Sequence, residues 1–119
     1  MNYDKEFNEL PKMIAGDRVF NLPLPTLVEG ETPDGQSFQE KTVLNYISHQ
    51  GAVFQLKSPV TIGTRLRLAI DLPRALAEDK NLKLIIRGQV ILVERLVNRK
   101  NRQRVTMRFE NKYFIKEKI

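Results

Sequence analysis

The sequence predicts an all-β domain in which about six antiparallel strands close into a barrel or a sandwich. Residues 64–72 alternate strictly, because Leu66, Leu68, Ile70 and Leu72 fall on one face of an extended chain. The run 82–96 is rich in β-branched residues, and turn residues such as Pro33-Asp34-Gly35 separate the extended segments. Many strands in one small chain usually close on themselves, because closure removes exposed sheet edges.

Along the chain, residues 4–15 have weak helical spacing that Pro11 interrupts, so residues 1–16 are expected to form an arm or a short helix. The prolines at 23 and 25 cannot donate to a sheet ladder and favour an edge position for the segment around them. The strands themselves are expected, in order, at residues 26–29, 37–48, 52–57, 64–72, 82–96 and 103–110.

The segments between the expected strands also contain residues typical of turns, bends and loops. The first two expected strands form a hairpin, and the tight connection at 49–51 leads into the third. Residues 73–81 suggest a helical turn or a loop, and Gly88 within a strand suggests a bulge or a bend at a barrel corner. Residues 113–119 are expected to form a tail or a short helix, which leaves residues 17–112 for the barrel domain.

Composition excludes several kinds of chemistry. The 119 residues, typical of one domain, include no cysteine and only one histidine, His49. We therefore expect no thiolate nucleophile, no metal site, no cofactor and no enzymatic activity. No apolar run is long enough to span a membrane. The polar, acidic start lacks the pattern of a signal peptide, and we expect a cytoplasmic protein.

The net charge of +6 is unevenly distributed. Residues 1–82 hold nine Lys+Arg against eleven Asp+Glu, a net −2, whereas residues 83–119 hold eleven against three, a net +8. The densest basic stretch consists of Arg99, Lys100, Arg102, Arg104 and Arg108. Such a stretch is either a solvated hairpin tip and strand face or a docking surface for phosphates.

Five short motifs occur in an order that resembles one family, the PilZ domains, which are bacterial receptor modules for cyclic di-GMP. The motifs are DRVF at 17–20, YISHQGA at 46–52, GTRLRL at 63–68, RGQV at 87–90 and VTMRF at 105–109. The resemblance covers about residues 17–112, most of the chain. It implies a six-stranded antiparallel β-barrel with a short flanking helix, and cyclic di-GMP as the ligand.

The resemblance also implies ligand-binding residues. Arg18 matches the first arginine of the family's Arg-x-x-x-Arg arm, while Ser48 and Gly51 match its Asp/Asn-x-Ser-x-x-Gly motif. Leu22 replaces the second arginine and Tyr46 replaces the Asp or Asn. Asn45 is one residue from that position, so only a bulge would bring it to the same face.

Each candidate residue also has a structural interpretation. Arg18 is either a ligand contact or a solvated arm residue, and Ser48 and Gly51 are turn residues whether or not they touch a ligand. Tyr46 either stacks on a base or simply covers the sheet. His49 is expected to be an exposed turn residue.

Three functions remain open. The first is a cyclic di-GMP receptor or effector with weakened or rearranged binding. The second is a PilZ-like module that has lost the nucleotide and docks on a signalling, motility or pilus protein. The third is nucleic-acid binding through the basic C-terminal third, which the scarcity of aromatic residues among those charges disfavours. The oligomeric state is left open.

Overall fold

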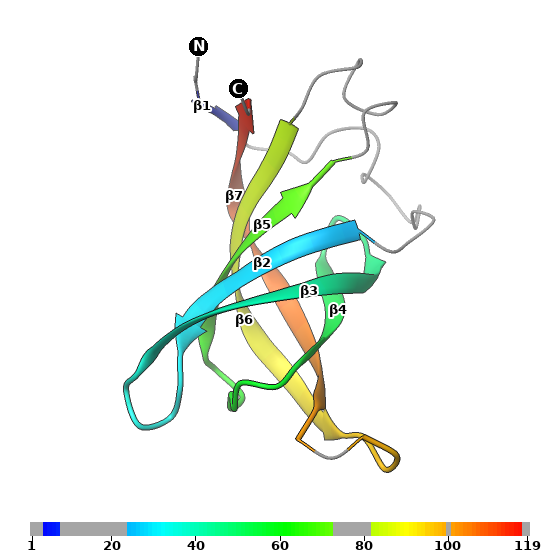
Figure 1. Cartoon of the computed structure of the whole chain (residues 1–119). Helices are drawn as coiled ribbons and strands as arrows, with labels where there is room; N and C mark the ends of the chain where they lie inside the picture. Colours follow the sequence, from blue (N-terminus) through cyan, green and yellow to red (C-terminus); the bar gives the residue numbers. More distant parts are fainter. Residues whose placement is uncertain (1–3, 8–23, 73–81, 100, 118–119) are drawn as a thin grey trace.

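The computed structural model describes residues 4–7, 24–72, 82–99 and 101–117, which form strands and the turns between them. Figure 1 shows these strands. In chain order they are β1 (Asp4–Phe7), β2 (Leu24–Glu31), β3 (Ser37–Ile47), β4 (Gly51–Leu56), β5 (Arg65–Asp71), β6 (Leu82–Arg95) and β7 (Gln103–Glu117). The all-β prediction is confirmed.

Six of the strands form a closed antiparallel barrel. The hydrogen-bonded order is β1-β7-β4-β3-β2-β5-β6. An additional pairing of β6 with β7 closes a ring that consists of the six strands β2 to β7. The long pair β6 and β7 runs the whole height of the molecule, and the β2–β3 hairpin projects sideways (Figure 1). Closure pairs each barrel strand on both sides, which leaves no free edge in the ring.

The described parts of the two chain ends, expected as an arm or short helix and as a tail or short helix, are strands. Asp4–Phe7 is strand β1, and it pairs with β7 from Asp4↔Lys116 to Phe7↔Tyr113. Residues 113–117 are therefore the end of β7 rather than a helix, and the same stretch pairs on its other side with the start of β6. Pairing with β1 and β6 satisfies the backbone groups of residues 113–116 on both sides. At the other end of the chain, the helical spacing of residues 4–15 is weak and does not favour a helix over strand pairing.

A flanking helix is absent from the described residues. Residues 8–16, where the arm or helix was expected, and residues 73–81, where a helical turn or loop was expected, lie outside them. Among the residues that the structure describes, no helix is long and apolar enough to cross a membrane.

β2 lies inside the sheet although it contains Pro25. It pairs with β3 along its whole length, but its pairing with β5 begins only at Thr26↔Ile70. Pro25 therefore sits just before the second ladder begins, where that ladder needs no donor from it. At Pro25 the strand is thus paired on one side only, and β2 becomes an internal strand from Thr26 onward.

The core fills the barrel interior. Alternation along β5 buries Leu66, Leu68 and Ile70, as the period of two predicts. The other strands add apolar side chains that are also fully buried, among them Val28, Leu44, Phe54, Leu84, Ile86 and Met107. The described strands thus fill the barrel interior with a packed apolar core.

Candidate ligand-binding site

The turn that joins β3 to β4 holds two of the predicted site residues. The Ser48 N–H donates to the Gly51 carbonyl (2.9 Å), and the Gln50 N–H donates to Ser48 Oγ (3.2 Å). Ser48 is only 7% exposed. Its hydroxyl therefore shapes the turn as an acceptor, as serine hydroxyls commonly do. His49 is exposed at the same turn, as expected.

Backbone contact between β4 and β7 fixes this turn against the barrel. The Phe109 N–H donates to the Gln50 carbonyl (2.8 Å), and Gly51 is the cross-strand partner of Arg108. A Cβ atom at position 51 would lie 2.1 Å from the carbonyl oxygen of Met107, which is far closer than any real contact. Gly51 is thus required by the close approach of two strands, independently of any ligand.

A bulge in β3 changes which face Asn45 occupies. The pairing of β3 with β4 shifts between Leu44 and Tyr46, so that Leu44 faces Phe54 and Tyr46 faces Val53. Leu44 and Ile47 are both buried, while Asn45 and Tyr46, consecutive in sequence, are both exposed. The bulge therefore places the Asn45 amide and the Tyr46 ring side by side on the outer surface, just before the Ser48 turn.

Tyr46 lies in a row of outward-facing residues that crosses four strands. Tyr46 pairs with Val53 of β4, Val53 with Thr106 of β7, and Thr106 with Leu92 of β6. A second bulge, in β6 between Val90 and Leu92, turns Ile91 and Leu92 outward together; they are 43% and 45% exposed. Tyr46, itself 42% exposed, thus covers the sheet face as one end of an apolar row.

Arg108 lies beside this row and next to Gly51. Its other cross-strand partner is Gln89 of β6, and Gln89 in turn faces Arg65 of β5. All three side chains are exposed, and residues that face one another across strands share a face of the sheet. The basic C-terminal stretch therefore contributes one arginine to the surface beside the Ser48 turn, through the β4–β7 pairing.

The family motifs predict neither the position of Arg108 nor the bulge at Ile91. The position of Arg108 follows from strand order, and local sequence carries no signal for it. The bulge at Ile91 does have a weak signal, because two large apolar residues in succession break the period of two.

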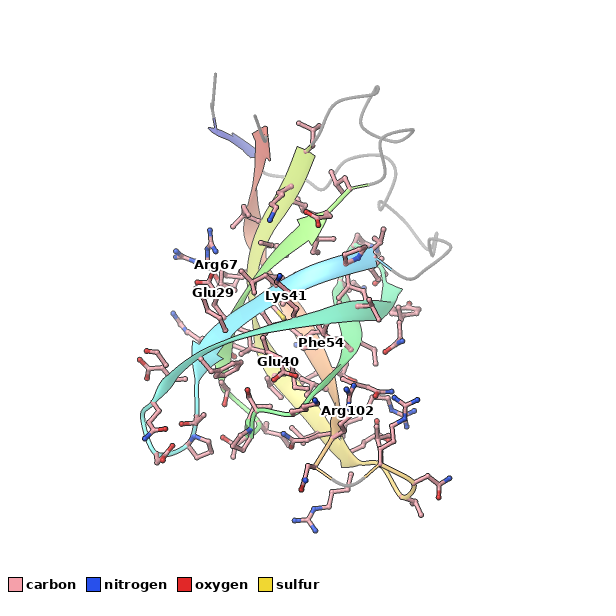
Figure 2. All side chains as sticks on the ribbon, viewed as in Figure 1. Glu29, Glu40, Lys41, Phe54, Arg67 and Arg102 are labelled. Carbon is pink, nitrogen blue, oxygen red and sulfur yellow. The ribbon has the colours of Figure 1, made fainter. Side chains whose placement is uncertain are left out.

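A separate hollow of 770 Å³ lies between the β2–β3 hairpin and strands β5 and β6. Three arginines and three glutamates line it, so that its formal charges balance: Arg65, Arg67, Arg87, Glu29, Glu31 and Glu110. Arg67 Nη1 lies 3.1 Å from Glu29 Oε1, a pair that Figure 2 shows at this side of the barrel. Arg87 faces Arg67 directly across β5 and β6. The carboxylate of Glu29 offsets the repulsion between these two arginines.

Arg18 lies outside the described residues, so of the predicted ligand-binding set the structure places Asn45, Tyr46, Ser48 and Gly51. The described residues contain no group of three or more acidic, histidine or cysteine side chains that could hold a metal ion. A scan against protein-family models and a search of curated proteins each found no match for this chain.

Proposed function

We propose that this chain is a PilZ-like domain that binds cyclic di-GMP on the outer face of its barrel, beside the turn at Ser48. The bulge at Asn45 is the observation that carries the proposal. It brings an amide to the face where the family has an Asp or Asn, one residue away from the matching position. The closed six-stranded barrel and the Ser48–Gly51 turn agree with the fold that the motif order implies.

The exposed groups at this surface suit the chemistry of a cyclic dinucleotide. The Asn45 amide both donates and accepts, as the edge of guanine requires. The Tyr46 ring offers a face on which a base stacks. The guanidinium of Arg108 forms charge-assisted, bidentate hydrogen bonds with phosphate oxygens, the role that the second arm arginine, replaced by Leu22, would otherwise fill. Ser48 and Gly51 contribute by holding the turn in shape.

Calorimetric titration of the full chain with cyclic di-GMP tests this proposal. We expect saturable heat, and binding at least about tenfold weaker in Arg108→Ala or Asn45→Ala, since each removes a directional contact. Lys41→Ala is the control, because it removes one positive charge from an exposed position on β3 that belongs to neither the Ser48 turn nor Arg108.

Two results would refute the proposal. One is the absence of heat at about 100 μM protein, which excludes a dissociation constant in the low micromolar range or below. The other is an equal loss of binding in Lys41→Ala and Arg108→Ala, which would point to net charge rather than to a site.

A second candidate function is docking on a signalling, motility or pilus protein. The row of Tyr46, Val53, Ile91 and Leu92 favours it, since these four exposed or half-exposed side chains lie on one sheet face, with only Thr106 between Val53 and Leu92. Ile91→Glu should abolish capture of such a partner and leave the heat of cyclic di-GMP binding unchanged. Capture that survives Ile91→Glu would exclude this face as the docking surface.

A further inference from the structure

A basic hollow lies at the end of the barrel opposite the Ser48 turn. It has a volume of 540 Å³ and forms where Lys57, just after β4, meets the β6–β7 hairpin. Figure 2 places Arg102 at this end of the molecule. Because β4 separates Lys57 from the Ser48 turn, and six strand residues span about 20 Å, the hollow is distinct from the proposed cyclic di-GMP site.

The charge of this hollow is entirely positive. Four cationic side chains line it: Lys57, Arg95, Arg99 and Arg102. No carboxylate is among the described lining residues, and none of the four cations forms an ion pair with a described residue. Four like charges around one hollow repel one another, and a multivalent anion would remove that repulsion.

Two acidic side chains adjoin the lining residues, Glu94 next to Arg95 in the sequence and Glu40 at the backbone of Lys57, and both accept hydrogen bonds. Glu94 receives two hydrogen bonds from the Arg104 guanidinium, at 3.1 and 2.9 Å. Glu40 accepts from the backbone N–H of Lys57 (2.7 Å) and from both the N–H (2.9 Å) and the hydroxyl (2.8 Å) of Ser58. Arg104 thus neutralises Glu94, whereas Glu40 keeps its negative charge at the edge of the hollow beside Lys57, and the four cations still leave the hollow with a net positive charge.

Hydrogen bonds hold the walls of the hollow in place. Gln103 Nε2 donates to the Ser58 carbonyl (2.9 Å), which ties β7 to the segment that follows β4. Arg99 Nη1 donates to Gln55 Oε1 (3.3 Å), which orients that guanidinium toward β4 while leaving its other N–H groups for a ligand. The walls of the hollow and one of its four cations are thus held in place before any ligand binds, which lowers the entropic cost of binding.

We infer that this hollow binds a chain of consecutive phosphate groups, either inorganic or the tail of a nucleoside oligophosphate. Charge complementarity favours such a ligand, because several phosphates in sequence present a charge density that matches four clustered cations. A nucleic-acid strand fits less well, since no aromatic ring is among the described lining residues and single-strand binding sites stack bases on such rings.

Titration of the full chain with sodium tripolyphosphate at low salt tests the inference. We expect saturable binding that weakens by about fivefold or more in Arg102→Gln and in Arg99→Gln, since each removes a charge-assisted contact. Lys41→Gln is the matched control: it removes one positive charge from an exposed position on β3 that lies outside the hollow. Thermal unfolding of each variant verifies that the fold is intact.

Additional titrations identify the source of the phosphates. ATP that binds as tightly as tripolyphosphate indicates a nucleoside oligophosphate, whereas tripolyphosphate binding without ATP binding indicates the inorganic chain. The inference is wrong if tripolyphosphate does not bind, or if Lys41→Gln weakens binding as much as Arg102→Gln. It is equally wrong if an oligothymidylate binds in the hollow more tightly than tripolyphosphate does. These results are independent of cyclic di-GMP binding at the other end of β4.

Discussion

Gly51 and Met107 approach so closely that a Cβ atom at position 51 would lie 2.1 Å from the carbonyl oxygen of Met107. On the other side of β7, a Cβ atom at position 88 would lie equally close to the carbonyl oxygen of Arg108. Gly51 of β4 and Gly88 of β6 thus flank β7 at two consecutive residues, Met107 and Arg108, where β7 pairs with both strands. Neither carbonyl can move away without breaking the pairing of its strand.

Gly51→Ala should therefore lower the free energy of unfolding by about 2–3 kcal/mol, because the methyl group must displace the backbone. Urea unfolding measures this loss. Gly30→Ala is the matched control, since the closest atom there is Cδ2 of Leu66, the end of a side chain that can rotate. A Gly51→Ala loss no larger than that of Gly30→Ala would show that β4 and β7 are farther apart than described.

The bulge in β3 yields a prediction that separates folding from binding. Deleting Asn45 leaves Leu44 next to Tyr46, so the strand regains a strict period of two and keeps Leu44 and Ile47 inward. We expect the barrel to remain folded, with a loss of about 1–2 kcal/mol in unfolding free energy. Cyclic di-GMP binding should weaken at least about tenfold, because the amide is gone.

Deletion of Val43 is the control for this experiment. Its removal places Thr42 directly before Leu44, so that one part of β3 must turn its core-facing side chains outward. Thermal unfolding should therefore show a much larger loss for this deletion than for that of Asn45. Equal losses would mean that the core does not depend on the register that the bulge sets.

Local alternation was sufficient to predict most of the fold. Period-two patterns and turn residues located the barrel strands from β2 to β6 within a few residues, since burial of one face leaves a signal in each strand. The ends were not predictable in the same way. β1 and the last residues of β7 are strands because they pair with each other and with β6, a relationship between distant segments that no local pattern carries.

In the candidate site, too, only the residues with a local sequence signal were predictable. The Ser48 turn was recognisable, because serine and glycine have local roles in turns. Whether Asn45 faces outward depends on a bulge that the sequence alone could not establish, and the position of Arg108 beside Gly51 depends on the order of β4 and β7. The residues that shape the turn were thus predictable, whereas most of those exposed around it were not.

Glu40 stabilises the segment that leaves β4. Its carboxylate accepts three hydrogen bonds, from two backbone N–H groups and one hydroxyl of Lys57 and Ser58. Glu40→Gln should cost about 1–2 kcal/mol in unfolding free energy, because the amide nitrogen cannot accept and leaves donors unpaired. Urea unfolding measures the effect, with Glu31→Gln as an exposed control that should change little. Matching losses in both variants would mean that these hydrogen bonds add nothing to stability.

The pair of Glu94 and Arg104 should make stability depend on pH. Hydrogen bonds from the Arg104 guanidinium lower the pKa of Glu94, against the opposing effect of desolvation and with help from the positive charge. Because the folded pKa lies below the unfolded one, the pair stabilises the fold above the ordinary glutamate pKa and loses that effect as the pH falls through the lowered value. The pKa of Arg104 is raised, so the alkaline limit lies far above neutral pH.

Thermal unfolding of the wild type and of Glu94→Gln between neutral and acidic pH measures this dependence. We expect the wild type to unfold at a slightly higher temperature at neutral pH, and the two curves to converge as Glu94 becomes protonated. High salt should reduce the difference at neutral pH, because both side chains are exposed and their attraction is screened. A difference that persists at acidic pH would show that Glu94 stabilises β6 through packing rather than through its charge.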